Sequence, residues 1–193
     1  RDDLVSHIYD VTYGTIKPTD TLVVLDDSIV RGTTLQKSII RILDTLKPKK
    51  IIVVSSAPQI RYPDCYGIDM AKLGDFIAFR AAIELLKKQG KEEVIEEVYK
   101  KCKESVSLPE YDGVNYVKGI YDLFTDDEIS KKVAQLIREE TINAEVEVIF
   151  QTVEHLHIAC PNHKGDWYFT GNYPTASGMR VVNRAFINYY EGK

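Results

Sequence analysis

The sequence has few cysteines, no excess of positive charge and no long apolar run. Three cysteines in 193 residues argue against a disulfide framework and favour a reducing compartment, so we expect a cytoplasmic protein. The 25 Lys and Arg residues are outnumbered by 29 Asp and Glu residues, and the formal net charge is −4. Non-specific binding of nucleic acid needs a basic surface, and a spanning helix needs about 18 apolar residues. We therefore expect neither nucleic acid nor a membrane among the partners.

The sequence also lacks an initiator methionine, a secretion signal, internal repeats and low-complexity tracts. It begins at Arg1, and its only methionines are Met70 and Met179, so we expect a piece of a longer protein. What is present is an ordinary globular composition, with 44% hydrophobic and 28% charged residues. A chain of this length can bury a sizeable core.

A pattern of strand, loop, helix and strand occupies the first third of the chain. Residues 22–25 and 51–54 are short apolar runs of the kind that form buried parallel strands. Between them, the apolar residues of 35–46 recur at helical spacing, and Pro48 ends the helix. Such a βαβ unit implies a parallel sheet. Because two parallel strands alone are not a stable sheet, either further strands come from outside this chain, or helices and a partner subunit cover the exposed edge.

The remainder of the chain is predicted to be mainly helical. Helical spacing of apolar residues predicts helices over 75–90, 91–105 and 126–137. Residues 144–160 carry both a short alternation typical of a strand and a longer helical pattern, and the longer pattern favours a helix. The tail from Pro161 is rich in Gly, Asn and aromatic residues and is expected to be extended.

The segment Leu22 to Thr34, with the sequence LVVLDDSIVRGTT, carries the chemistry. It places two aspartates at the C-terminal end of a buried strand, the edge of an open α/β sheet at which ligands bind. The loop that follows opens a helix, whose first backbone amides and positive partial charge favour an anion. A glycine in that loop lets the backbone approach the anion closely. The substrate-binding candidates are Asp26, Asp27, Ser28, Val30, Arg31, Gly32, Thr33 and Thr34.

Two carboxylates beside a phosphate-binding loop fit a ribose 5-phosphate. The aspartates suit vicinal sugar hydroxyls, or a divalent cation that bridges to phosphate. The segment is not a Walker loop, because it has no Gly-Lys-Ser/Thr, and it lacks the spaced glycines of a dinucleotide fingerprint. The alternative is a capped loop in which the aspartates serve only as turn and cap residues, and the length of the whole pattern argues against it.

This segment resembles the ribose-phosphate binding motif of type I phosphoribosyltransferases, and its part DDSIVRGTT is similar to that of the amidophosphoribosyltransferases. Residues 56–70, SAPQIRYPDCYGIDM, resemble the segment that follows the next strand in that family, and FTGNYPT at 169–175 is a weaker match. The resemblance implies an α/β fold, with a partial type I phosphoribosyltransferase sheet in residues 1–72. Residues 73–193 would be a mainly helical C-terminal extension packed on that sheet.

The resemblance also implies an enzyme of purine synthesis. Amidophosphoribosyltransferases make 5-phosphoribosylamine in the first step of de novo purine synthesis, when ammonia from glutamine displaces pyrophosphate from phosphoribosyl pyrophosphate (PRPP). By resemblance, Asp26 and Asp27 would bind Mg²⁺ and the ribose hydroxyls, and Val30 to Thr34 would hold the 5-phosphate. PRPP and purine nucleotides are the small-molecule partners that the family implies, and we expect a homo-oligomer.

Two features of the family have no counterpart in this sequence. The glutaminase domain and the first part of the transferase domain are not found in it, so we expect no turnover by this chain alone. Some relatives hold an iron–sulfur cluster through cysteines, but here Asp64 stands at the first position, with Cys65 displaced by one. Residues 165–168, just before the last matching segment, contain no cysteine. We therefore expect no such cluster.

Two further groups of residues have alternative interpretations. Four potential zinc ligands lie within nine residues, at His155, His157, Cys160 and His163. Their spacing matches no closed zinc pattern, so a solvated or packed cluster is favoured over a metal site. Arg61 and Tyr62 follow the second strand at the ligand-binding edge, where they would either contact a nucleotide or acceptor or only pack the loop.

Two other functions remain as alternatives. The first is a type I phosphoribosyltransferase that acts on a base, and the segment 56–70 argues against it. The second is a module that binds PRPP or nucleotides for regulation and has no catalytic activity. Ammonia-dependent activity of the full-length protein would distinguish the first alternative, and binding without turnover would favour the second.

Overall fold

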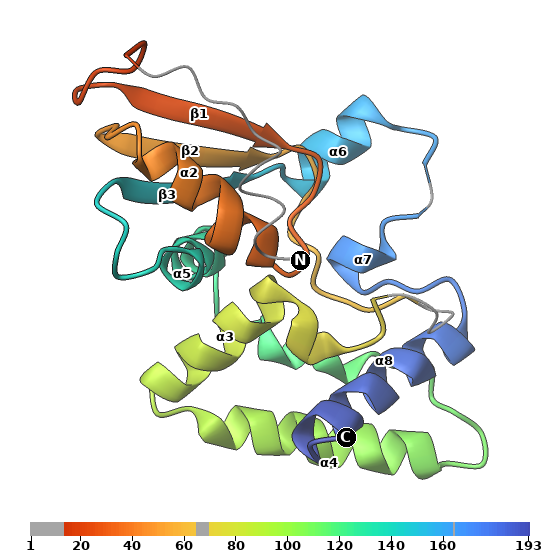
Figure 1. Ribbon diagram of the computed structural model, residues 1–193. Coiled ribbons are helices and arrows are strands. Elements are labelled where there is room, and N and C mark those ends of the chain that lie inside the picture. The colour runs from red at the N-terminus through yellow and green to blue at the C-terminus, as the bar shows by residue number, and fades with distance from the viewer. Residues whose placement is uncertain (1–13, 65–69, 164) are drawn as a thin grey trace.

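A three-stranded parallel sheet forms one end of the molecule in the computed structural model, which describes residues 14–64, 70–163 and 165–193 (Figure 1). The strands are β1 (Thr21–Asp26), β2 (Lys50–Ser55) and β3 (Glu145–Phe150), in the order β1-β2-β3. The register pairs Asp26 with Ser55, and Ser55 with Phe150. All three strands therefore end at the same edge, as the predicted βαβ unit requires.

The crossover between β1 and β2 is helical, as predicted. It begins as a π-helical segment, η1 (Leu35–Ile39), and continues as α2 (Ile40–Asp44). Leu35 and Ile40 are buried beneath the sheet. The helix ends at Asp44, and three residues later Lys47 takes a positive φ of 57°, just before Pro48. The sequence pattern and the observed helix thus agree at both ends to within about two residues.

The third strand corrects the prediction of a helix over 144–160. Residues 145–150 form β3, and only the short helix α6 (Val153–Ala159) follows. The alternation of Glu145 to Val148 matches a strand, and Val148 is 4% exposed because it lies beside buried Val53 on the same face of the sheet. Pairing with β2 outweighs the helical spacing, since a two-stranded parallel sheet gains stability from a third strand. Thr152 then caps α6 by accepting a hydrogen bond from the His155 amide at 3.1 Å.

The three helices predicted after the βαβ unit are confirmed. They are α3 (Ile77–Lys88), α4 (Glu92–Ser107) and α5 (Asp126–Ile137). The 3₁₀ segment η2 (Leu73–Asp75) precedes α3, and a second one, η3 (Tyr116–Ile120), lies between α4 and α5. A capping box between Thr125 and Glu128 starts α5 and explains its clear boundary. Among the described residues, no helix is both long and apolar enough to cross a membrane.

The tail is helical and not extended, which corrects a second prediction. It contains α7 (Trp167–Thr170) and α8 (Ala176–Tyr190). Thr175 caps α8 through the Gly178 amide at 3.1 Å, and Val182 and Phe186 are fully buried. Phe79 of α3 packs edge-on against Phe186, with ring centroids 6.0 Å apart. The aromatic residues that suggested an extended tail instead join α8 to the core.

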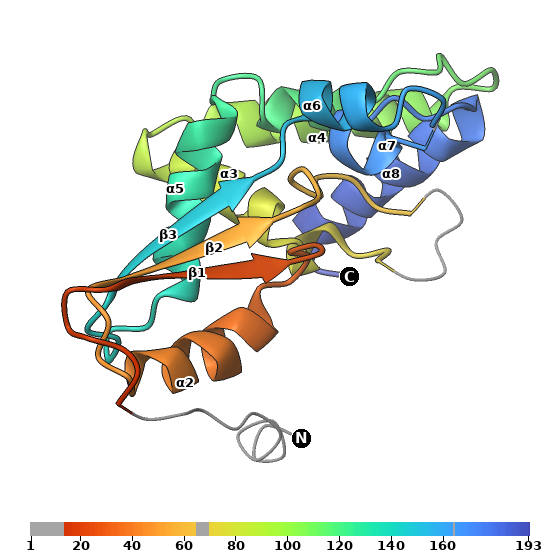
Figure 2. The same ribbon diagram turned by 90° about the horizontal axis from the view of Figure 1, so that it is seen from above.

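The sheet is covered on one face. Helices α2 and α5 lie against that face, and α3, α4 and α8 form a second group beyond them (Figures 1 and 2). Ile51 and Val53 of β2 point into this covered side and are fully buried. On the other face, Val23 is 61% and Leu25 is 79% exposed, so the described elements leave it open. The boundary expected at residue 72 stays a prediction, and β3 joins the sheet from beyond it.

Candidate functional site

The predicted phosphate loop encloses a small cavity at the C-terminal end of β1. The cavity has a volume of about 320 Å³. All the predicted substrate-binding residues except Asp27 line it, together with Ile29 and Leu35, and these are Asp26, Ser28, Val30, Arg31, Gly32, Thr33 and Thr34. Ile29 and Leu35 are 2% and 4% exposed, so two buried side chains anchor the loop near its ends.

The backbone of this loop is arranged to face an anion. Gly32 has a φ of 72°, in the left-handed region that glycine adopts without strain. The first helical hydrogen bond runs from the Gln36 amide to the Gly32 carbonyl at 2.9 Å. The backbone amides of residues 33–35 precede this bond, so the helix provides no carbonyl for them to bond. The start of the helix therefore offers backbone donors and positive partial charge to the cavity.

The N-terminal end of α3 supports the loop from behind, which the sequence did not predict. The amide of Ile77 donates to the Val30 carbonyl at 2.8 Å. The side chain of Arg31 pairs with Asp75, with its Nε 3.4 Å from Oδ2. These contacts join residues more than 40 positions apart, so no local sequence signal points to them.

The two aspartates keep oxygens for a ligand. Asp26 Oδ1 accepts a hydrogen bond from the Asp27 amide at 2.9 Å, and Asp27 Oδ1 accepts one from the Ser28 hydroxyl at 3.3 Å. The described residues provide no partner for the other oxygen of either carboxylate. Sites for Mg²⁺ commonly use one or two carboxylates, with waters and substrate phosphates completing the shell. The pair therefore fits either Mg²⁺ or sugar hydroxyls.

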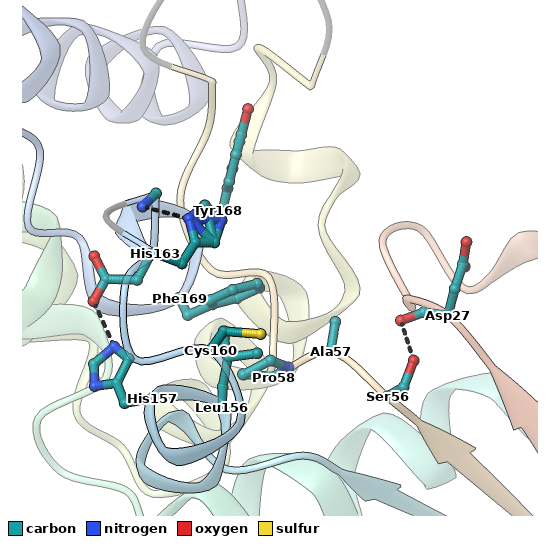
Figure 3. Close-up of a pocket in the computed structure, with 12 residues that line it drawn as sticks. Asp27, Ser56, Ala57, Pro58, Leu156, His157, Cys160, His163, Tyr168 and Phe169 are labelled. Carbon is teal, nitrogen blue, oxygen red and sulfur yellow. Dashed lines mark hydrogen bonds and ion pairs between the residues drawn. The ribbon is translucent and has the colours of Figure 1, made fainter.

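A second cavity, of about 400 Å³, has Asp27 at its edge (Figure 3). Asp27 lines it, whereas Asp26 lines the first cavity. Its walls are largely apolar and come from the end of β2 and from α6 and α7, including Pro58, Leu156, Tyr168 and Phe169. Ser56 joins the two strands here, because its hydroxyl donates to the Asp27 carbonyl at 3.1 Å. The helix predicted over 144–160 includes α6, whereas α7 belongs to the tail that the sequence analysis expected to be extended.

The histidine and cysteine cluster does not converge on one point. His157 Nε2 lies 3.0 Å from Asp166 Oδ2, while His163 Nδ1 accepts a hydrogen bond from the Gly165 amide at 3.2 Å. His157, Cys160 and His163 line the second cavity, and His155 does not (Figure 3). Over the described ranges, no three His, Cys, Asp or Glu side chains are grouped to hold a metal ion. The geometry favours the solvated or packed interpretation.

The side chains of Arg61 and Tyr62 contact other parts of the protein, and neither residue lines either of the two cavities. Tyr62 is 3% exposed, with its ring centroid 5.5 Å from that of Tyr121, and burial raises the pKa of its hydroxyl. Arg61 donates two hydrogen bonds to Gln59 Oε1, at 3.1 and 2.7 Å, and also pairs with Asp126. Its guanidinium carbon lies 5.1 Å from the centroid of the Tyr121 ring. These contacts support the packing alternative for both residues.

The segment compared with iron–sulfur relatives is only partly described. Asp64 Oδ1 accepts a hydrogen bond from the Tyr168 hydroxyl at 3.3 Å, so the two regions named in that comparison do lie together. Cys65 lies outside the described residues. The expectation that no cluster is bound stays a prediction.

Comparison with curated proteins finds amidophosphoribosyltransferases. The chain is 33% identical to the protein of that name from Saccharomyces cerevisiae over 135 residues, which are 66% of this chain and 26% of that protein. It is 40% identical to the one from Haemophilus influenzae over 45% of this chain and 17% of the relative. It is 46% identical to the one from Escherichia coli over 30% of this chain and 11% of the relative. No family model matches the chain, and no solved structure matches it with significance.

These matches confirm the resemblance to the amidophosphoribosyltransferases. The chain spans about a quarter or less of the length of the relatives described above. It therefore corresponds to part of such a protein.

Proposed function

We propose that this chain, a relative of the amidophosphoribosyltransferases, forms the ribose 5-phosphate-binding part of an enzyme that makes 5-phosphoribosylamine. The reaction would use PRPP and ammonia from glutamine, in the first step of de novo purine synthesis. The observation that carries the proposal is the cavity lined by Asp26 and residues 28–35, in which a carboxylate and the open end of a helix face the same space. An anionic sugar phosphate matches both groups.

In this proposal, the loop and the aspartates bind different parts of the substrate. The amides at the start of η1, with the hydroxyls of Thr33 and Thr34, bind the 5-phosphate. The carboxylates of Asp26 and Asp27 accept hydrogen bonds from the ribose hydroxyls. Fixing the phosphate and the ribose positions the anomeric carbon for attack.

The same carboxylates act on the charge that develops during reaction. The bond from ammonia nitrogen to the anomeric carbon forms as pyrophosphate leaves with its bonding electron pair, and positive charge grows on the ribose ring. Fixed negative charge at Asp26 and Asp27 stabilises that state. We also propose that the aspartates hold Mg²⁺ with the substrate, where the ion would neutralise charge on the leaving pyrophosphate.

The purine nucleotide partners would use both cavities. A nucleoside 5-monophosphate shares its phosphate and ribose with the substrate, and the second cavity begins at Asp27. Pro58, Tyr168 and Phe169 give that cavity the flat, apolar walls that suit a base. We therefore propose that the phosphate lies in the loop and the base in the second cavity.

The remaining parts of the proposal concern the whole protein. A glutaminase domain would supply ammonia, and the first part of the transferase domain would complete the pyrophosphate site. We propose a cytoplasmic homo-oligomer in which this chain alone binds ligand without turnover. The two alternatives are a base-specific phosphoribosyltransferase and a regulatory PRPP- or nucleotide-binding module. Ammonia-dependent consumption of PRPP by the full-length protein distinguishes the proposal from both.

Calorimetric titration of this chain with PRPP, with and without Mg²⁺, tests the site. We expect metal-dependent binding by the parent chain and its loss in the double variant Asp26→Asn/Asp27→Asn. A double variant with Asp122→Asn and Glu110→Gln is the control, because it removes the same two charges at exposed positions away from the loop. Circular dichroism would check that all three proteins are folded.

The outcome is decided by comparing the two double variants. Binding that is lost only without Asp26 and Asp27 supports the site assignment. Equal affinity in the parent and in the Asp26→Asn/Asp27→Asn variant would contradict it. Failure of the parent to bind would contradict the proposal that this segment forms the phosphate site by itself.

A further inference from the structure

Two consecutive carbonyls of the phosphate loop are held by the same helix. The Ile77 amide, at the start of α3, donates to the Val30 carbonyl at 2.8 Å. One helical turn later, Nη2 of Arg80 donates to the Arg31 carbonyl at 2.9 Å. α3 thus fixes the two peptide units that lead into Gly32.

Because the peptide bond is planar, these two contacts also determine which way the neighbouring loop amides point. In a trans peptide, the N–H points opposite to the C=O of the same unit. Because the carbonyls of Val30 and Arg31 face α3, the amides of Arg31 and Gly32 point away from α3. Both residues line the first cavity, so this orientation adds two donors to those of the helix start.

Arg80 is the side chain best suited to hold this arrangement. Arg80 is also exposed, but its guanidinium donates to a backbone carbonyl, and such a charge-assisted hydrogen bond is stronger than one between neutral groups. The side chain of Arg31 is turned toward Asp75, with side-chain exposures of 52% and 43%, and such an exposed pair contributes little. Gly32 has no side chain of its own to restrain its peptide, so the restraint must come from a neighbour.

We infer that Arg80 is a positioning residue for phosphate-monoester binding, which holds the Arg31–Gly32 peptide so that the Gly32 amide faces the ligand. The inference rests on the proposed function for the identity of the ligand. It predicts that the conformation of the loop depends on a residue 49 positions away in the sequence. It also assigns Arg80 a function that is separate from the stability of α3.

The variant Arg80→Met tests the inference, with Lys88→Met as its matched control. Both changes remove one positive charge from α3 and introduce the same side chain, and Lys88 is exposed at the opposite end of the helix. Arg80→Lys is the conservative variant, because it keeps the charge and a donor. The chain contains 11 glycines, so labelling with ¹⁵N-glycine gives a small spectrum in which the Gly32 amide can be followed.

Ribose 5-phosphate is the probe, and the expected results differ among the three variants. We expect Arg80→Met to weaken binding by about tenfold, in the range for loss of one hydrogen bond to a charged group. Lys88→Met should bind within about twofold of the parent, and Arg80→Lys should recover part of the loss. Without ligand, the Gly32 amide resonance should shift in Arg80→Met and stay in place in Lys88→Met. The melting temperature of Arg80→Met should fall by only several degrees, as expected for loss of one hydrogen bond in a chain of this size.

The possible failures separate the inference from the proposed function. If the parent binds and Arg80→Met binds equally well, the inference is wrong and the phosphate site stands. If Arg80→Met and Lys88→Met weaken binding to the same extent, only the net charge matters and the positioning role is excluded. If the parent does not bind, the proposed phosphate site is contradicted. An unshifted Gly32 resonance in ligand-free Arg80→Met would overturn the positioning role independently of binding.

Discussion

Gly32 of the phosphate loop packs directly against Ile77 of α3. A β-carbon at Gly32 would overlap Cδ1 of Ile77 and would lie 3.1 Å from Cγ2 of Ile137. The loop therefore rests on two buried side chains with no space between them, and its backbone position is set by that contact. Any side chain at this position must displace the end of the Ile77 side chain, or move α3, α5 or the loop itself.

We expect Gly32→Ala to destabilise the protein by about 2–5 kcal/mol. The left-handed backbone costs an L-residue about 1–2 kcal/mol, and overpacking against Ile77 adds about 1–3 kcal/mol. The control is Gly113→Ala, since Gly113 has the same φ of 72° but no atom within 4 Å of its added β-carbon. Denaturant unfolding measures both. Equal losses in the two variants would show that the close packing at Gly32 has no energetic effect.

We expect Arg61→Met to reduce stability and leave ligand affinity unchanged. Its hydrogen bonds to Gln59 and its pairing with Asp126 join the end of β2 to the start of α5. Loss of hydrogen bonds from a largely buried guanidinium should lower the free energy of unfolding by about 1.5–3 kcal/mol. Denaturant unfolding and titration with ribose 5-phosphate measure the two effects. Weaker binding at unchanged stability would instead favour the ligand-contact alternative for Arg61.

The two free cysteines of the described residues should differ strongly in reactivity. Cys102 is fully buried, and burial raises the pKa of its thiol to about 12. Cys160 is exposed beside the second cavity. Because the thiolate is the reacting species, iodoacetamide at pH 8 should modify Cys160 more than about a hundredfold faster than Cys102. Peptide mass spectrometry resolves the two sites, and similar native rates would contradict the observed burial of Cys102.

Glu191 should stabilise the folded protein in a pH-dependent way. Hydrogen bonds from Lys193 and Tyr99 lower the pKa of its carboxyl from 4.5 to about 2. Because the folded pKa is the lower one, the stabilisation is complete above about pH 4.5 and declines as the pH falls toward 2. The melting temperature of Glu191→Gln should therefore lie below that of the parent at pH 6, with the difference disappearing near pH 2.

The control for this experiment is Glu110→Gln. Glu110 is exposed, and the structure gives it no hydrogen bond or ion pair among the described residues. Its substitution should leave the melting temperature unchanged at every pH tested. A difference between the parent and Glu191→Gln that persists at pH 2 would show that the effect does not come from ionisation of this carboxyl.

The phosphate loop was predictable because it is local. One strand, one loop and one helix start, all within residues 21–39, place the side chains that line the first cavity. The geometry of such a unit depends on the strand and helix propensities of its residues and on the position of Gly32, and both can be read from the sequence. The partners from η2 and α3 were not visible, because Asp75, Ile77 and Arg80 reach the loop only after the chain has folded.

The misassigned elements show where local patterns fail. In residues 145–150, four alternating residues competed with a longer helical pattern, and pairing with β2 decided the outcome. In the tail, Gly and Asn residues suggested extended chain, although Thr175 begins a capped helix with Val182 and Phe186 in the core. The spacing of Met179, Val182 and Phe186 was a signal of helix that could have been found in the sequence.

The position of β3 in the sheet has a consequence for synthesis of the protein. Its strand is made about 90 residues after β2 is complete, so β2 has an unpaired edge when it leaves the ribosome. At about 5–20 residues per second, this interval lasts roughly 5 to 20 s. Closing so long a loop is also slow on entropic grounds. The nascent chain therefore passes through a stage in which a hydrophobic strand is available to chaperones before its intended neighbour exists.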